Sequence, residues 1–302
     1  MEKQTYEEIV KPLLVDDTLP VIKWMQQIKL IPIQRQCHEC KGYLHWTQHN
    51  GTNDGYRWVC SEKECTRYKQ TVSIRKDTIF FNSKINLQKW VQLIYCWCFE
   101  FSEAATVNLT NISRRSIQDI FASFRMACSQ YFKDFPVQLG GPGVVVQIDE
   151  SCFSHKVKFH RGRGPSEPLW VFGIVDTSVS PAIGYMEIVP KRDAATLLPI
   201  IERIVRPGSI IHSDEWRAYS KLSSNANYVY RTVNHSKHFV DPVSGVHTQT
   251  VESYWGKHKY RIKKMKGCRK DLLQGYLDQF MWLERQRGNK FLSFCEELQY
   301  RQ

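Results

Sequence analysis

Two short runs of β-branched residues in the second half of this chain each end in an aspartate. Residues 143–149 read Gly-Val-Val-Val-Gln-Ile-Asp, and residues 209–214 read Ser-Ile-Ile-His-Ser-Asp. Short apolar runs of this composition predict buried strands, so Asp149 and Asp214 are expected at strand ends. Glu252 lies in a segment with helical spacing, whose apolar stripe is Val251, Tyr254, His258, Ile262 and Met265. Two strands and a helix thus supply three carboxylates that can converge on divalent cations.

The order of predicted elements favours an α/β fold with a mixed sheet. Further strands are predicted at residues 169–176, 182–189 and 228–233. A helix capped by Asp193 separates the third strand from the fourth. Three consecutive strands favour an antiparallel meander, and the whole order is typical of a ribonuclease H-like domain, a mixed sheet flanked by helices. If the first and fourth strands pair side by side, Asp149 and Asp214 are neighbours.

Four of the ten cysteines are paired in sequence. Cys37 and Cys40 form CxxC, and Cys60 and Cys65 follow after nineteen residues as CxxxxC. Two such knuckles supply the four ligands that one structural Zn²⁺ requires, so residues 35–80 are predicted to form a zinc ribbon. Because the second knuckle is longer than the commonest spacing, His38 or His45 replacing a cysteine is an alternative, as are four unrelated thiols.

The stretch between the ribbon and the first strand is predicted to be helical. An amphipathic helix is expected at about residues 86–100, followed by a short helix capped by Ser102 and a longer helix that starts after Ser113. Short helix, turn and longer helix is the order of a helix-turn-helix. Arg114 and Arg115 then become candidates for contacting DNA phosphate or guanine. An ordinary helical linker with solvated arginines is the alternative.

The composition favours a polyanionic partner. Lys and Arg outnumber Asp and Glu by 42 to 30, which gives a net charge of +12 and a pI near 9.2. Such a balance favours nucleic acid, with a merely basic protein as the alternative. The sequence has no apolar run of about 18 residues and no signal-peptide pattern, so it is not expected to span a membrane or to be secreted.

Several basic residues are candidates for holding a DNA backbone. Lys259, Lys263 and Lys266 share the predicted helix face of Glu252. They belong to a stretch, residues 257–270, that holds eight Lys or Arg and no acid. A solvated basic face or an import signal are the alternatives. Arg161 and Arg163 lie in a glycine-flanked loop after the first strand, where cations on flexible backbone suit phosphate contact.

Five segments together carry a family resemblance. They read Val-Gln-Ile-Asp-Glu at 146–150, His-Arg-Gly-Arg-Gly at 160–164, His-Ser-Asp-Glu-Trp-Arg-Ala-Tyr at 212–219, Val-Asn-His-Ser at 233–236 and Gln-Thr-Val-Glu-Ser-Tyr-Trp at 249–255. As a set they resemble the Merlin superfamily of cut-and-paste DNA transposases and its bacterial insertion-sequence relatives. The resemblance covers roughly residues 35–285. The 37 residues between Asp214 and Glu252 fit the family pattern.

The resemblance implies a ribonuclease H-like DDE catalytic domain that recognises terminal inverted repeats, cleaves the element ends and joins them to target DNA. Two Mg²⁺ or Mn²⁺ ions are expected, bridged by Asp149 and held on either side by Asp214 and Glu252. His235 is implied near the scissile phosphate as a hydrogen-bond donor or proton carrier, and a structural histidine is the alternative. A homodimer or larger assembly on double-stranded DNA is expected. The expected location is the nucleus in a eukaryote, or the cytoplasm and nucleoid in a bacterium.

The sequence is accordingly divided into five predicted segments. They are an N-terminal helical segment at 1–34, the zinc ribbon at 35–80, a helix-turn-helix DNA-binding domain at 83–135, the ribonuclease H-like DDE catalytic domain at 143–290 and a C-terminal tail at 291–302. Two other functions stay open. One is a domesticated sequence-specific DNA-binding regulator, which would not cleave DNA. The other is a ribonuclease H-type nuclease, which would not prefer an inverted repeat.

Overall fold

The computed structural model describes residues 2–153, 168–234 and 239–299. Three predicted site residues, Arg161, Arg163 and His235, lie outside these ranges, so their predicted roles stay predictions. None of the described helices combines the length and the apolar composition that crossing a bilayer requires.

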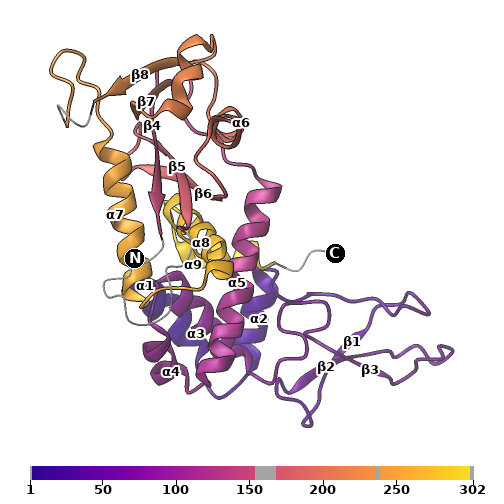
Figure 1. Ribbon diagram of the computed structural model, residues 1–302. Coiled ribbons are helices and arrows are strands. Elements are labelled where there is room, and N and C mark those ends of the chain that lie inside the picture. The colour runs from indigo at the N-terminus through magenta and orange to yellow at the C-terminus, as the bar shows by residue number, and fades with distance from the viewer. Residues whose placement is uncertain (1, 154–167, 235–238, 300–302) are drawn as a thin grey trace. The chain divides into compact units, whose positions relative to one another are not determined.

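The chain divides into two compact units (Figure 1). Unit 1 comprises residues 1–127 and 286–302, and unit 2 comprises residues 128–285. The five predicted segments remain a prediction about domains, because compactness alone does not decide which parts fold independently.

Unit 1 holds short helices and a small antiparallel sheet in the order β1-β2-β3. Its elements are α1 (Glu2–Thr5), a π-helical turn (Tyr6–Val10), a 3-10 turn (Lys11–Leu13), α2 (Leu19–Gln27), β1 (His45–Gln48), β2 (Tyr56–Val59), β3 (Thr71–Ser73), α3 (Leu87–Cys98), α4 (Glu103–Thr110), the first part of α5 (Arg114–Asp134) and α9 (Lys290–Glu297). The predicted caps are present: Ser102 accepts a hydrogen bond from the Ala105 N–H, and Ser113 accepts one from the Ser116 N–H.

Aromatic side chains from distant parts of the sequence form the core of unit 1. Trp97 of α3 stacks on Phe294 of α9 with ring centroids 4.1 Å apart, and Phe124 of α5 meets the same ring edge-on at 5.2 Å. Such pairs add about 0.5–1.5 kcal/mol each beyond the burial of their area. The segment from residue 291 therefore packs into unit 1 through a helix.

Unit 2 is built on a five-stranded mixed sheet in the order β6-β5-β4-β7-β8. Its elements after α5 are β4 (Val145–Cys152), β5 (Trp170–Asp176), β6 (Ile183–Val189), α6 (Ala194–Ile204), β7 (Ile210–Asp214), a 3-10 helix (Arg217–Ser224), β8 (Val229–Val233), α7 (Gln249–Lys264), a 3-10 turn (Lys270–Leu272) and α8 (Leu273–Arg285). β4, β5 and β6 form the predicted antiparallel meander. β7 pairs parallel to β4, and β8 pairs parallel to β7. The predicted mixed sheet flanked by helices is confirmed.

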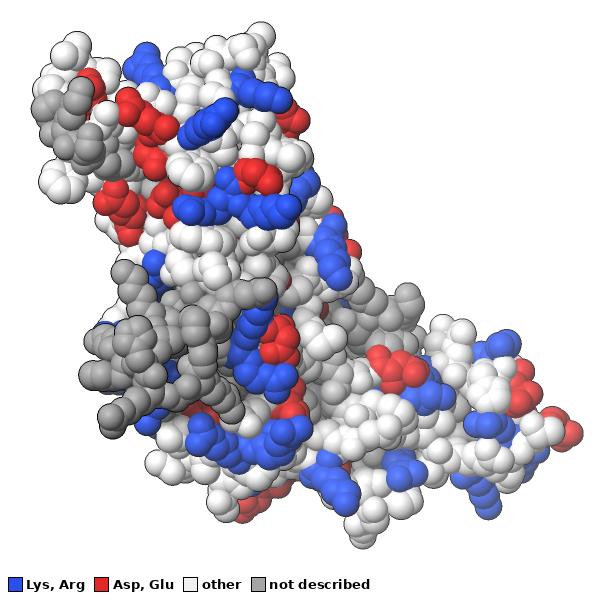
Figure 2. Space-filling view, in the orientation of Figure 1, with Lys and Arg blue, Asp and Glu red and all other residues white. Residues whose placement is uncertain are grey.

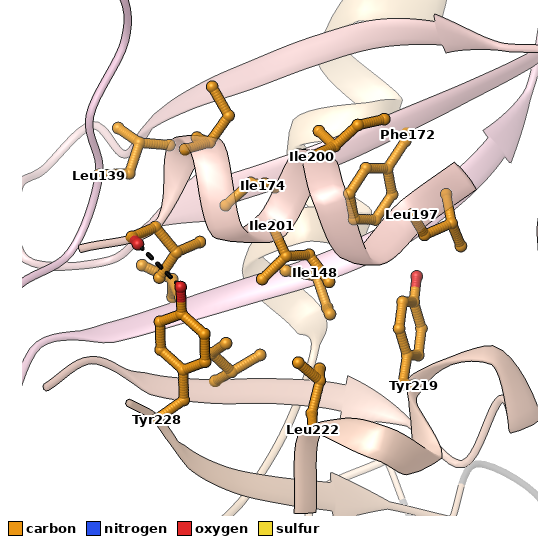
Figure 3. Close-up of a cluster of buried hydrophobic side chains, with 14 of the residues drawn as sticks. Leu139, Ile148, Phe172, Ile174, Leu197, Ile200, Ile201, Tyr219, Leu222 and Tyr228 are labelled. Carbon is orange, nitrogen blue, oxygen red and sulfur yellow. Dashed lines mark hydrogen bonds between the residues drawn. The ribbon is translucent and has the colours of Figure 1, made fainter. Parts of the chain in front are cut away.

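Different helices cover the two faces of this sheet, and alternate residues of each strand point toward one face or the other. Ile148 of β4 and Phe172 of β5 pack against Ile201 of α6 on one face (Figure 3). Val171 and its neighbours on the other face pack against Leu277 of α8 and the apolar side of α7. Because both faces are covered, the strands are continuous apolar runs, which is why the sequence pattern identified them.

Helix α7 ends earlier than predicted. Its last residue is Lys264, whereas the predicted stripe continued through Met265 and Lys266. Lys266 has φ of 63°, and the Gly267 N–H donates to the carbonyl of Ile262 at 2.9 Å. This is the left-handed turn with which many helices end. The prediction that Lys266 lies on the helix face of Glu252 is therefore wrong, and Met265, the last residue of the predicted apolar stripe, is the exposed C-cap residue.

Candidate active site

The register of the sheet places Asp149 and Asp214 side by side. β4 and β7 are parallel neighbours, with Gln147 opposite His212. Two residues further along both strands, Asp149 is level with Asp214. Adjacent strands lie about 4.8 Å apart and residues two apart share a face, so both carboxylates leave the sheet on the same side. The neighbour relation expected for these two strands is thus present.

Helix α7 covers that face through two aromatic residues that rest on glycines. Trp255 lies over Gly173 of β5, where an added Cβ would stand 2.4 Å from the indole ring. Tyr254 lies against Gly184 of β6, where an added Cβ would stand 2.7 Å from the phenol ring. Any larger residue would collide with these rings, so the two glycines set how closely α7 approaches the sheet.

Trp255 also contacts the first acid directly. Its indole Nε1 donates a hydrogen bond of 2.9 Å to Oδ2 of Asp149. Asp149 is paired with Gly173 across β4 and β5, so the ring that rests on the glycine reaches the neighbouring carboxylate. This bond fixes the orientation of the carboxylate.

Gln147, two residues before Asp149 on β4, holds the start of α7. Its side chain is buried, and its Oε1 accepts a hydrogen bond of 3.0 Å from the N–H of Val251. The N-cap residue of the helix, Thr248, makes no side-chain cap bond to the backbone. A strand side chain therefore satisfies one of the free N–H groups with which every helix begins. Glu252 follows Val251 in the same turn.

The two contacts between β4 and α7 have matching spacing. Gln147 and Asp149 are about 6.6 Å apart along a strand, because a strand rises about 3.3 Å per residue. Their partners, Val251 and Trp255, are about 6 Å apart along a helix, because a helix rises 1.5 Å per residue. Strand and helix can therefore run side by side with both bonds formed, and Glu252 lies between the two points of contact.

The three acids influence one another electrostatically. Burial, with the charges of Asp214 and Glu252 acting in the same direction, raises the pKa of Asp149 to about 6 against the opposing hydrogen bond from Trp255. Carboxylates that lie close together repel one another when they are ionised. A divalent cation bound between their oxygens offsets that repulsion. Among the described residues these carboxylates do not form a group with all ligand atoms within 4.8 Å. When two ions lie about 3.5–4 Å apart, ligands on the far sides of the pair can be more than 4.8 Å from each other. The three carboxylates therefore fit a pair of Mg²⁺ or Mn²⁺ ions.

A buried acid on α8 anchors the middle of α7. Glu284 accepts a 2.8 Å hydrogen bond from the Tyr254 hydroxyl, and its other oxygen lies 2.5 Å from Lys257 Nζ and 3.0 Å from His258 Nε2. Burial raises the pKa of Glu284, but the contacts with His258 and Lys257 outweigh burial and lower the pKa to about 2. The helix that carries Glu252 is therefore fastened along its length.

The nearby acids that are not part of the triad have other partners. Glu150 faces the opposite side of the sheet, where it accepts a hydrogen bond from the Tyr219 hydroxyl. Burial raises the pKa of Glu150 to about 7. Glu215 accepts a 2.6 Å hydrogen bond from the amide of Asn234. Neither side chain takes the position of the three acids on the α7 face.

Charged side chains of both signs surround the acids on one side of unit 2. Figure 2 shows acidic residues near the start of α7, with Lys and Arg around them. Lys259 lies 5.6 Å from the Phe153 ring centroid, and burial lowers the pKa of its ammonium while the charge of Asp149 acts to raise it. Lys263 is exposed on α7, and Lys266 lies beyond the end of the helix. The ammonium of Lys259 thus lies near enough to Asp149 for the two charges to interact.

In unit 1 the four predicted zinc ligands come together. The sulfur atoms of Cys37 and Cys65 are 3.8 Å apart, those of Cys40 and Cys60 are 3.9 Å apart, and all four lie within 4.8 Å of one another. A tetrahedral site with Zn–S bonds of about 2.3 Å has S···S edges of about 3.8 Å, so the group fits one Zn²⁺. His38 and His45 are not in the group.

The predicted DNA-binding arginines of unit 1 are exposed at the start of α5. α4 and α5 are joined by a turn in which Asn111 adopts φ of 53°. Arg114 pairs with Glu103 at 2.7 Å and Arg115 pairs with Asp119 at 3.2 Å, yet 73% and 84% of the two arginine side chains stay exposed. Both guanidinium groups are within reach of a ligand in solution.

Sequence reasoning missed the residues that dock α7. Gln147 was visible as the one polar side chain inside a buried strand, which requires a hydrogen-bond partner. Gly173 was visible as a glycine between large apolar residues of a central strand, a position that indicates close approach of another group. Neither signal indicates which distant segment supplies the partner.

Comparison with known proteins relates this chain to transposases. Residues 138–284 match the ISXO2-like transposase domain family. A curated protein of Haemophilus influenzae, described as an uncharacterized transposase-like protein, is 33% identical over 98 residues, which cover 32% of this chain and 77% of that protein. A cryo-EM structure of the simian T-cell lymphotropic virus intasome in complex with PP2A regulatory subunit B56 gamma is 17% identical. That match covers 62% of this chain and 66% of the other, and its TM-score of 0.28 is too low to establish a common fold.

Proposed function

Because the chain belongs to the ISXO2-like transposase family, of the insertion-sequence type, we propose that unit 2 is a ribonuclease H-like DDE domain that cuts and joins DNA. The observation that carries the proposal is the placement of Asp149 level with Asp214 under α7, the helix of Glu252. The sheet order, with three antiparallel strands followed by two parallel ones, supports the same fold.

The three acids would hold two Mg²⁺ or Mn²⁺ ions, which when bound polarise the scissile phosphate and supply an activated water. The chain's own residues hold the acids still: Trp255 fixes the Asp149 carboxylate, and Gln147 fixes the turn that carries Glu252. Hydrolysis at the element end frees a 3′-hydroxyl. That hydroxyl then attacks a target phosphodiester, forming one P–O bond as another breaks. His235, outside the described residues, is proposed to bond the scissile phosphate.

DNA recognition is assigned to unit 1 and to the basic residues of unit 2. α4 and α5 have the order of a helix-turn-helix, and Arg114 and Arg115 are exposed where its second helix begins. The four-cysteine group would hold one structural Zn²⁺ and thereby stabilise β1-β2-β3. Lys259 and Lys263 of α7, with Lys266, Arg161 and Arg163, are proposed to contact the backbone near the acids.

Cut-and-paste transposition handles two element ends together, so we expect a homodimer or larger assembly on the terminal inverted repeats and the target DNA. This proposal places the protein in the nucleus of a eukaryote or at the nucleoid of a bacterium. Size-exclusion chromatography with light scattering, with and without repeat DNA, measures the assembly directly.

A cleavage assay tests the function. Labelled duplexes that carry the inverted repeats flanking the coding sequence are incubated with Mg²⁺ and protein, and Asp149→Asn is compared with Glu215→Gln, an exposed neighbouring acid outside the triad. Wild type and Glu215→Gln should nick the repeat end, whereas Asp149→Asn should lose at least about a hundredfold in rate. Equal cleavage by Asp149→Asn, or equal cleavage of random duplex, would exclude the proposal.

A further inference from the structure

Arg192, in the segment between β6 and α6, is held between two tryptophans. Its guanidinium carbon lies 3.6 Å from the ring centroid of Trp170 and 5.0 Å from that of Trp216. The Trp216 indole Nε1 also donates a 3.1 Å hydrogen bond to the Arg192 carbonyl. Stacking on aromatic faces restricts a guanidinium but leaves its in-plane N–H donors available, because these point outward from the edge of the plane.

Within the part of the chain that the structure describes, this guanidinium has no carboxylate partner of the kind that other arginines have. Arg75 pairs with Asp54, Arg203 with Glu187 and Arg269 with Asp271. Among the described residues, no carboxylate oxygen lies within 4.0 Å of the Arg192 nitrogens. Glu150 is near enough for the charge of Arg192 to lower its pKa, but the Glu150 carboxylate is bonded to Tyr219. No direct ion pair with a described residue therefore neutralises the charge of Arg192.

The two tryptophans place this charge at the carboxyl ends of the strands that carry the acids. Trp216 follows β7 by two residues, and its backbone N–H donates a 3.0 Å hydrogen bond to Oδ1 of Asp214. Trp170 is paired with Cys152, the last residue of β4, three residues after Asp149. Trp216 thus connects Arg192 to the end of β7, and Trp170 connects it to the end of β4.

From this geometry we infer that Arg192 binds a backbone phosphate of the DNA where the duplex passes the carboxyl ends of β4 and β7, on the α6 side of the sheet. A guanidinium bonds a phosphate through two parallel N–H···O contacts, and a fixed guanidinium loses little further freedom on doing so. Trp170 and Trp216 are positioning residues that aim the side chain. The inference rests on the proposed function, since it takes DNA as the anion that approaches the acids.

Binding without cleavage tests the inference. The probe is a short fluorescein-labelled duplex of random sequence, because phosphate contacts do not depend on sequence. Fluorescence anisotropy gives the binding constant of the full-length chain over a series of salt concentrations, with Ca²⁺ in place of Mg²⁺. Arg192→Gln should weaken binding about tenfold and reduce the slope of log K against log salt by about 0.9, the value for one duplex phosphate contact.

Three further variants separate a phosphate contact from a structural role. Arg203→Gln removes the same charge from an arginine paired with Glu187 at 2.5 Å, and should leave the slope unchanged. Arg192→Lys keeps the charge and should keep the slope with weaker binding. Trp216→Leu removes one of the two rings that hold the guanidinium and should also keep the slope with weaker binding, so it carries the test if Arg192→Gln does not fold.

The outcomes distinguish the inference from the proposed function. If wild type binds duplex and Arg192→Gln matches Arg203→Gln in slope and affinity, Arg192 does not contact phosphate, and the proposed function stands. The same conclusion follows if Trp216→Leu binds duplex as tightly as wild type and a folded Arg192→Gln has the wild-type slope of log K against log salt. If wild type binds no duplex at low salt, the proposed function itself is overturned, and the inference with it.

Discussion

The pKa of the Asp149 carboxyl group is clearly shifted by its surroundings. Burial is the largest influence on its pKa, the charges of Asp214 and Glu252 act in the same direction, and together they raise the pKa from 3.8 to about 6 against the opposing Trp255 bond. An acid whose pKa is raised by folding is more easily protonated in the folded state. Its contribution to stability is therefore complete below pH 3.8 and is lost as pH rises through about 6.

Asp149→Asn should consequently stabilise the protein at neutral pH when no divalent cation is added. The expected gain in the free energy of unfolding is about 1–3 kcal/mol above pH 6, and it should vanish below about pH 4. Urea unfolding across this pH range measures the gain. Asp176→Asn is the control: burial acts to raise the pKa of Asp176, yet bonds from Ser178 and Gly140 lower it, so this variant should be destabilised at neutral pH.

At the scale of elements, the docking of α7 decides whether Glu252 reaches the two aspartates. Three features fix that docking: the glycines under Trp255 and Tyr254, the Gln147 cap and the Glu284 anchor. They come from β4, β5 and β6, which lie far from α7 in sequence, and from α8, which follows α7 closely. The active-site geometry is therefore a property of tertiary packing, and variants of these residues should affect catalysis without touching DNA.

Gly173→Ala should displace Trp255, because the new Cβ would stand 2.4 Å from its ring. Overpacking of this kind costs about 1–3 kcal/mol, and loss of the bond to Asp149 should lower the cleavage rate. The matched control is Gly256→Ala, on the same helix as Trp255. Its Cβ would meet nothing within 4 Å, so it should be active and slightly stabilised. Melting temperatures that rank the two variants in reverse would contradict this docking.

Gln147→Ala should loosen the start of α7, since the Val251 N–H loses its acceptor. The expected loss of stability is about 1–2 kcal/mol, and the Mg²⁺ concentration for half-maximal cleavage should rise severalfold. Gln147→Glu retains an acceptor oxygen and should be closer to wild type in its Mg²⁺ requirement. If both variants require wild-type Mg²⁺ concentrations, Gln147 does not position Glu252.

In unit 1, Cys60→Ser should remove one of the four thiols that lie within 4.8 Å of one another. We expect the protein to lose its single zinc and the β1-β2-β3 sheet to lose hydrogen-exchange protection, because structural zinc is coupled to folding. Zinc content per chain measures the first effect. Cys152→Ser lies outside this group and should retain zinc; equal zinc content in the two variants would contradict a four-cysteine site.

Across the whole molecule, sequence patterns predicted the elements whose structure follows from burial alone. The Val and Ile residues of β4 and β7 identified both as buried strands, whereas their pairing side by side was only a condition of the ribonuclease H-like arrangement and became visible in the sheet order. The position of Glu252 required more, because α7 is docked by Gln147 and Gly173, more than seventy residues away in sequence. The helical spacing of apolar residues predicted an α7 that is too long, because such spacing does not reveal that Lys266 adopts a left-handed backbone conformation.

The central claim is that Asp149, Asp214 and Glu252 together hold divalent cations, and metal location tests it most directly. Crystals of the full chain soaked in Mn²⁺ should give anomalous density within about 2.3 Å of carboxylate oxygens of Asp149 and at least one other acid of the triad, and Asp149→Asn crystals should lose that density. Anomalous density that stays in Asp149→Asn crystals, or that appears only at acids outside the triad, would contradict the claim.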